Sequence, residues 1–162
     1  MEIERKYLVH NLPDNLSAYP HSKIEQAYLC LSPVVRVRRL DDCHILTVKE
    51  KRHADGTTAI VNREEEFDLS EEAYNSLKSK AITPCLTKTR YKLPLPEGLT
   101  AELDVFHRSL EGLMMVEVEF PDIESSMKFQ PPEWFGEEVS DDPRFRNTAL
   151  AVEGNPLTHT IL

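Results

Sequence analysis

Short segments in which charged and apolar residues alternate with a period of two run through most of this chain. Residues two apart in a β-strand share one face, so each segment predicts a strand with one charged and one apolar face. We predict eight strands, at about residues 1–9, 24–32, 34–40, 43–52, 59–69, 86–93, 100–107 and 113–121. Short turns separate several of them, and connections of that length favour antiparallel neighbours.

Three helices are expected beside the strands. Ser70 is a good N-cap for a helix over residues 71–80, which has acidic residues in its first turn and lysines in its last. A short helix is expected over residues 122–129, where it stops before two prolines. A last helix is expected to start around residue 142 and to end by residue 154, which is a glycine.

These elements predict a mainly β (α+β) fold within a single domain that spans residues 1–162. The predicted architecture is an eight-stranded antiparallel closed tunnel barrel with a few flanking helices. A β-sandwich would fit the same number of strands, so the character of the alternating faces has to separate the two.

The charged faces of the predicted strands carry doublets of a single sign. The basic doublets are Arg36 and Arg38, Lys49 and Lys51, and Lys88 and Arg90, while the acidic ones are Glu2 and Glu4, Glu64 and Glu66, Glu102 and Asp104, and Glu117 and Glu119. Like charges on one face repel each other, so each doublet indicates a ligand of opposite charge. A polyphosphate with Mg²⁺ or Mn²⁺ satisfies both signs at once, and a polar barrel interior is where it would bind. For any one strand, an ordinary sheet face with its charges in water is the alternative.

The net charge restricts where an anion could bind. The chain has 28 acidic and 19 basic residues and a net charge of −9, which argues against nucleic acid or an anionic membrane as a partner. A small polyanion that fits inside the barrel is the predicted ligand. The charged N-terminus and the lack of a run of about 18 apolar residues predict a cytoplasmic protein without a transmembrane helix. Apolar outer strand faces also favour a homodimer.

In their order along the chain, the charged blocks resemble the CYTH family, also called the triphosphate tunnel metalloenzymes. The matching blocks are E-x-E-x-K at Glu2, Glu4 and Lys6, R-x-R at Arg36 and Arg38, a lysine at Lys49, E-x-E at Glu64 and Glu66, K-x-R at Lys88 and Arg90, an acidic pair at Glu102 and Asp104, and E-x-E at Glu117 and Glu119. Glu65 leaves the register of the fifth strand uncertain by one residue. Arg146 stands where the family often has a lysine in a C-terminal helix that helps to close the tunnel.

The resemblance implies metal-dependent hydrolysis of inorganic tripolyphosphate inside the tunnel. It implies that the substrate is bound by Lys6, Arg36, Arg38, Lys49, Lys88, Arg90 and Arg146. It implies that Mg²⁺ or Mn²⁺, with two ions during turnover, is held by Glu2, Glu4, Asp104, Glu117 and Glu119. It gives catalytic roles to Glu4, Glu64 and Glu66, which would assist the attacking water or orient the bases.

Three other functions fit the same residues. A class IV adenylate cyclase and a thiamine or nucleoside triphosphatase share the scaffold, and a non-enzymatic polyphosphate-binding module would keep the bases without needing the metal carboxylates. Single residues also have alternatives: Arg90 could brace a neighbouring carboxylate, Glu102 could be structural, and Glu4 and Lys6 could form a surface ion pair.

Overall fold

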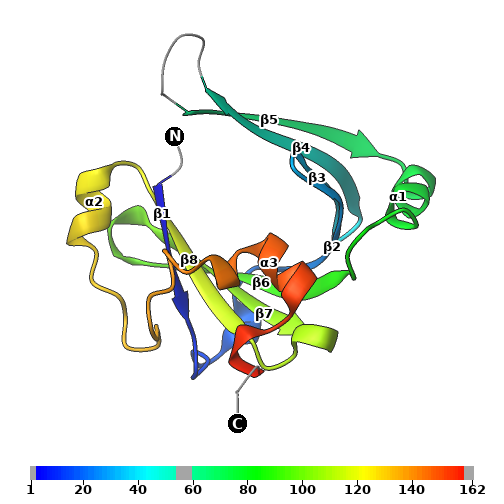
Figure 1. The fold of residues 1–162 in the computed structure, drawn as a ribbon. Helices are drawn as coiled ribbons and strands as arrows, with labels where there is room; N and C mark the ends of the chain where they lie inside the picture. The colour runs from blue at the N-terminus through cyan, green and yellow to red at the C-terminus, as the bar shows by residue number, and fades with distance from the viewer. Residues whose placement is uncertain (1–2, 54–59, 159–162) are drawn as a thin grey trace.

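The computed structural model describes residues 3–53 and 60–158, and the predicted metal ligand Glu2 lies outside them. Within these ranges, eight antiparallel strands form one strongly curved sheet (Figure 1). Their bounds are β1 Ile3–Leu8, β2 His21–Leu31, β3 Val34–Leu40, β4 Cys43–His53, β5 Ile60–Leu69, β6 Leu86–Pro94, β7 Thr100–His107 and β8 Met114–Phe120. The prediction of a mainly β, eight-stranded antiparallel fold is therefore confirmed.

The sheet has the strand order β1-β8-β7-β6-β2-β3-β4-β5, and in the described residues no ladder joins β1 to β5. The predicted closure of the barrel is therefore not seen. Part of the reason is that the outer edge of β1 already has a partner. The Leu8 N–H donates to the Glu137 carbonyl, and the Gly136 and Val139 N–H groups donate to the Leu8 and Lys6 carbonyls. We call residues 136–140 the edge segment.

In the part of the chain that the structure describes, three α-helices flank the sheet: α1 Glu71–Lys78, α2 Ile123–Lys128 and α3 Asn147–Glu153. The Ser70 side chain accepts a hydrogen bond from the Ala73 N–H, which confirms the predicted N-cap of α1. The last helix starts later than predicted. Asp142 caps only a short 3₁₀ turn over Pro143–Phe145, and Arg146 then has an extended backbone that separates this turn from α3.

Each face of the sheet has its own cover (Figure 1). On the outside, α1 packs Tyr74 against Ala27 and Val37, and residues of the α2 region cover Tyr7 and Phe120. Inside the hollow, α3 and the turn before it form an apolar cluster with the inner strand faces, whose members include Tyr28, Leu86, Phe106, Met115, Phe145, Leu150 and Ala151. The hollow is therefore filled at α3, and the charged side chains lie on the strand faces that α3 leaves uncovered. None of the helices in the described part of the chain has the length and apolar character needed to cross a bilayer.

Candidate functional site

Two arginines on β3 form the basic side of the hollow. Arg36 faces Tyr28 of β2 and Arg38 faces Gln26, so all four side chains point to the concave face. Gln26 Oε1 accepts hydrogen bonds from Arg38 Nε at 3.0 Å and Nη2 at 2.8 Å. Arg36 is 8% exposed, its Nη2 donates to Thr47 Oγ1 at 3.4 Å, and its buried Nε has no acceptor among the described groups.

These two guanidinium groups keep their positive charges largely uncompensated. Among the described side chains, no carboxylate forms an ion pair with either of them, and their hydrogen-bond acceptors are neutral. Burial and the charge of Arg36 lower the pKa of Arg38 to about 10. A buried charge without a counterion is costly, so this side of the hollow is suited to receive an anion.

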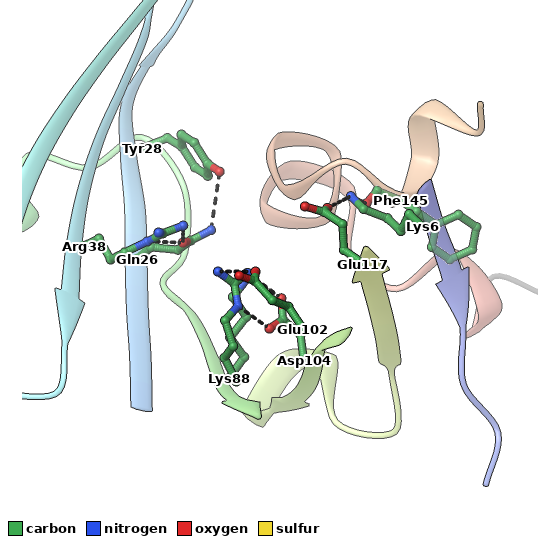
Figure 2. Close-up of polar contacts among 10 residues, drawn as sticks. Lys6, Gln26, Tyr28, Arg38, Lys88, Glu102, Asp104, Glu117 and Phe145 are labelled. Carbon is green, nitrogen blue, oxygen red and sulfur yellow. Dashed lines mark hydrogen bonds and ion pairs between the residues drawn. The ribbon is translucent and has the colours of Figure 1, made fainter. Parts of the chain in front are cut away.

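The floor between the two sides holds a compact charged cluster (Figure 2). Lys88 is fully buried, and its Nζ forms an ion pair with Asp104 Oδ2 at 2.8 Å. Arg90 donates to both oxygens of Asp104, from Nε to Oδ1 at 2.8 Å and from Nη2 to Oδ2 at 3.0 Å. Burial alone would raise the pKa of Asp104, but Lys88 and Arg90 outweigh it and lower the pKa to about 2. Burial lowers the pKa of Lys88 to about 8, and Asp104 only partly opposes this.

Carboxylates of β1, β7 and β8 form the acidic side. Glu4 faces Glu119 and Glu102 faces Glu117 across neighbouring strands, so like charges are directly opposed. Burial, followed by the hydrogen bond and charge of Glu4, raises the pKa of Glu117 to about 7. Lys6 Nζ lies 3.8 Å from Glu117 and donates to the Phe145 carbonyl at 3.4 Å (Figure 2).

The chemistry of this acidic side fits a hard cation. Opposed carboxylates repel each other, and a divalent ion between them would remove that repulsion. A cavity of about 430 Å³ opens here, and Glu102, Glu117 and Glu119 lie in its wall. In the described part of the chain, no three such side chains converge closely enough to enclose an ion as they stand.

The strand β5 settles the register that Glu65 left open. Glu64 faces Lys49 and Glu66 faces Thr47, so both share the concave face with Arg36. Glu65 points to the other face, where Arg63 binds it at 2.6 Å. Glu64 Oε1 lies 3.7 Å from Lys49 Nζ, and both side chains are about two-fifths exposed. This ion pair is therefore more accessible to solvent than the cluster of Lys88, Arg90 and Asp104.

The comparisons with known proteins agree on one family. The chain is 37% identical over 155 residues to the inorganic triphosphatase of Nitrosomonas europaea, with 93% of this chain and 97% of the relative aligned. It is 35% identical to the inorganic triphosphatase of Acetivibrio thermocellus, with 92% of each aligned.

The chain belongs to the triphosphate tunnel (CYTH) family of inorganic triphosphatases.

A crystal structure of an inorganic triphosphatase matches with a TM-score of 0.75 at 35% identity, over 94% of this chain and 95% of that one. A putative adenylyl cyclase from Hippeastrum, with a TM-score of 0.51 at 18% identity over 78% of this chain and 83% of that one, shares the fold. No protein-family model matches the chain.

Within this triphosphatase fold, most of the predicted bases and acids lie on one concave face. Both oxygens of Asp104 are engaged by Lys88 and Arg90, and its role as a metal ligand stays a prediction. Arg90 braces this carboxylate, and its role at the substrate stays a prediction. Arg146 is exposed and precedes α3. The neighbouring Asn147 instead lines a small cavity beside the floor cluster.

Three polar residues of the hollow were missed by the sequence interpretation: Gln26, Tyr28 and Asn147. Gln26 and Tyr28 are two apart on a predicted strand, so the period-two pattern already placed them on one face. Neutral side chains were passed over because only charge was used to find the site. Asn147 carried no signal, because the predicted helix start at residue 142 gave it no special position.

Proposed function

We propose that this protein hydrolyses inorganic tripolyphosphate in the hollow of its sheet. The observation that carries the proposal is a pair of arginines, the buried Arg36 and the partly buried Arg38, on the same concave face as opposed carboxylates. Among the described residues, neither arginine has a carboxylate partner. A linear triphosphate with divalent cations would complement both sides. The relatives named inorganic triphosphatase support this choice.

The bases would bind and orient the phosphoryl groups. Arg36 and Arg38 offer N–H groups in a fork that matches two phosphate oxygens, and Lys6, Lys49 and Lys88 add point charges. Arg90 retains its predicted role at the substrate, while Asp104 holds it in place from below. Phosphoryl transfer depends mainly on positioning and charge neutralisation, so no nucleophilic side chain is required.

The carboxylates would hold the metal. Glu4, Glu117 and Glu119, together with Glu2, are the proposed ligands of Mg²⁺ or Mn²⁺, with two ions during turnover. When bound, the ions supply Lewis-acid polarisation of the phosphoryl oxygens. Glu64 and Glu66 keep their proposed role of orienting the attacking water or the bases, and Glu64 already lies beside Lys49.

Phosphate release from tripolyphosphate tests the metal assignment. We expect activity with Mg²⁺ or Mn²⁺, none with EDTA, and a loss of at least about 100-fold in Glu4→Gln, which removes one ligand charge. The matched control is Glu111→Gln, the same change at an exposed turn residue. Full activity in EDTA or in Glu4→Gln would refute the metal assignment.

The basic side has its own matched pair on one strand. Arg38→Ala should raise KM about 10- to 100-fold, because it removes a charge-assisted contact to the substrate. Arg39→Ala changes the next residue, which is exposed on the opposite face, and should leave KM unchanged. Equal effects of the two variants would contradict a site on the concave face.

A substrate panel separates the related activities. Cyclic AMP formation from ATP would indicate the cyclase, and faster turnover of thiamine triphosphate or ATP than of tripolyphosphate would indicate the organic triphosphatase. Tight binding of tripolyphosphate without turnover would indicate the binding module. The cytoplasmic location, the homodimer and the absence of nucleic-acid and membrane partners stay predictions from the sequence.

A further inference from the structure

Gln26 is a buried amide that holds a charged group of the site. Its side chain lies on β2 with 0% exposure, directly opposite Arg38 on β3. Its Oε1 accepts from both Nε and Nη2 of Arg38, so the amide binds one edge of the guanidinium fork. Its Nε2 lies 3.5 Å from the Tyr28 hydroxyl and donates to it, which orients the amide with its oxygen toward Arg38.

Arg90 on β6, the other neighbour of β2, shows how a carboxylate binds a guanidinium group in this hollow. Arg90 also donates from Nε and Nη2, but to the two carboxylate oxygens of Asp104, and Glu102 lies 3.3 Å from its Nη1. That charge is compensated within the protein. Among the side chains that the structure describes, Arg38 has no carboxylate partner, and the single amide oxygen that holds both its Nε and its Nη2 carries no negative charge.

We propose that Gln26 is a positioning residue for triphosphate binding, which fixes the orientation of Arg38 while leaving its positive charge available to the substrate. This inference rests on the proposed function of the same hollow. A carboxylate at position 26 would hold Arg38 as firmly and would also neutralise it. An apolar side chain of similar length would leave the charge but release the fork.

Because Arg38 lies in a largely buried position, an amide and a carboxylate at position 26 should differ in their effects on stability and on substrate affinity. Arg38 shares the hollow with Arg36, and both burial and this like charge disfavour its ionised form. An introduced carboxylate would relieve that unfavourable interaction and so stabilise the folded protein. The same carboxylate would weaken the attraction for a polyanion, so stability and substrate affinity should move in opposite directions.

The test compares Gln26→Glu and Gln26→Met with the wild type. Tripolyphosphate binding is measured by calorimetry in EDTA, where only the bases contribute, and KM, kcat and melting temperature are measured alongside. The chain offers a matched control in Gln130→Glu, the same chemical change at its other glutamine, which is exposed.

We expect Gln26→Glu to weaken tripolyphosphate binding about 10- to 100-fold, the scale of one close charge pair, without lowering the melting temperature. KM should rise more than kcat falls. Gln26→Met should weaken binding less, and Gln130→Glu should change neither quantity. Unchanged binding in Gln26→Glu, or equal losses in Gln26→Glu and Gln26→Met, would overturn the inference.

The same measurements keep this inference separate from the proposed function. If the wild type binds tripolyphosphate, loses that binding in Gln26→Glu, and releases no phosphate, then the hydrolase proposal is wrong and the role of Gln26 stands. If the wild type hydrolyses tripolyphosphate and Gln26→Glu binds it equally well, then the role of Gln26 is wrong and the hydrolase stands.

Discussion

Asp104 is the counterion on which the floor of the site depends, and replacing it with asparagine should be costly. It is 8% exposed and lies 2.8 Å from both Lys88 Nζ and Arg90 Nε. Asp104→Asn keeps the size of the side chain but leaves the fully buried Lys88 without its counterion and the partly buried Arg90 with Glu102 alone, at 3.3 Å. Removing one partner of a buried ion pair typically costs about 3–5 kcal/mol.

The lowered pKa of Asp104 gives a second estimate of how much its negative charge stabilises the folded protein. A pKa lowered from 3.8 to about 2 means that the folded protein favours the ionised carboxylate by about 2 kcal/mol. The two figures together predict that Asp104→Asn lowers the free energy of unfolding by about 2–5 kcal/mol at pH 7. For a domain of this size, that corresponds to a fall of roughly 5–15 °C in melting temperature.

The pH dependence follows from the sign of the shift. A carboxylate whose pKa is depressed on folding stabilises the folded state above its unfolded pKa, and this contribution is lost as the pH falls through the folded value. The difference between wild type and Asp104→Asn should therefore be full at pH 5–7 and should shrink between about pH 4 and pH 2.

Urea unfolding of both proteins at pH 7, 5, 4 and 3 measures this difference directly. Asp42→Asn, at the exposed turn between β3 and β4, is the matched control and should change stability by less than about 0.5 kcal/mol. A difference at pH 7 below about 1 kcal/mol, or one that is as large at pH 3 as at pH 7, would refute the assignment of Asp104 as the counterion.

Three further outcomes are expected. Mg²⁺ should raise the melting temperature more at pH 8 than at pH 6, because burial and Glu4 hold the pKa of Glu117 at about 7 and the metal needs the ionised form; an equal rise at both values would contradict a role for Glu117 as ligand. Gly136→Ala should destabilise the fold by about 1–3 kcal/mol in urea, since a Cβ there would lie 2.8 Å from the Leu8 carbonyl oxygen; wild-type stability would show that the edge segment yields without cost. Ser70→Ala should cost about 1 kcal/mol through the lost cap of α1 and leave kcat unchanged, because α1 lies on the outer face; a fall in kcat would couple that face to the site.

The strands could be predicted from the sequence because charge and apolar character alternate along them. The same alternation places Arg36 and Arg38, or Glu117 and Glu119, on one face without any knowledge of the partner strand. The open side of the barrel could not be predicted in this way. The edge of β1 is occupied through backbone hydrogen bonds to residues 136–140, and backbone pairing leaves no side-chain pattern in the sequence.

Some features of the site could be predicted from one strand alone, while others depend on how that strand pairs with its neighbours. The positions of Glu64 and Glu66 required the ladder with β4, because three consecutive glutamates fit either register. The resemblance to the family placed Asp104 among the metal ligands, and that role stays a prediction. Its actual partners, Lys88 and Arg90, come from the adjacent strand, so only the pairing of β6 with β7 distinguishes a counterion from a ligand.

The placement of β1 sets the order in which the site can be assembled during synthesis. This strand carries Glu4 and Lys6 and is translated before the other seven, yet it pairs with β8 and with the edge segment near residue 138. The Arg5–Glu138 ion pair joins residues 133 positions apart. Contacts of such long range form late, so most of the chain must leave the ribosome before β1 is held in place. Partly made chains therefore carry the bases of β3 without the carboxylates of β1 and β8 beside them, and triphosphate chemistry has to wait until translation is nearly complete.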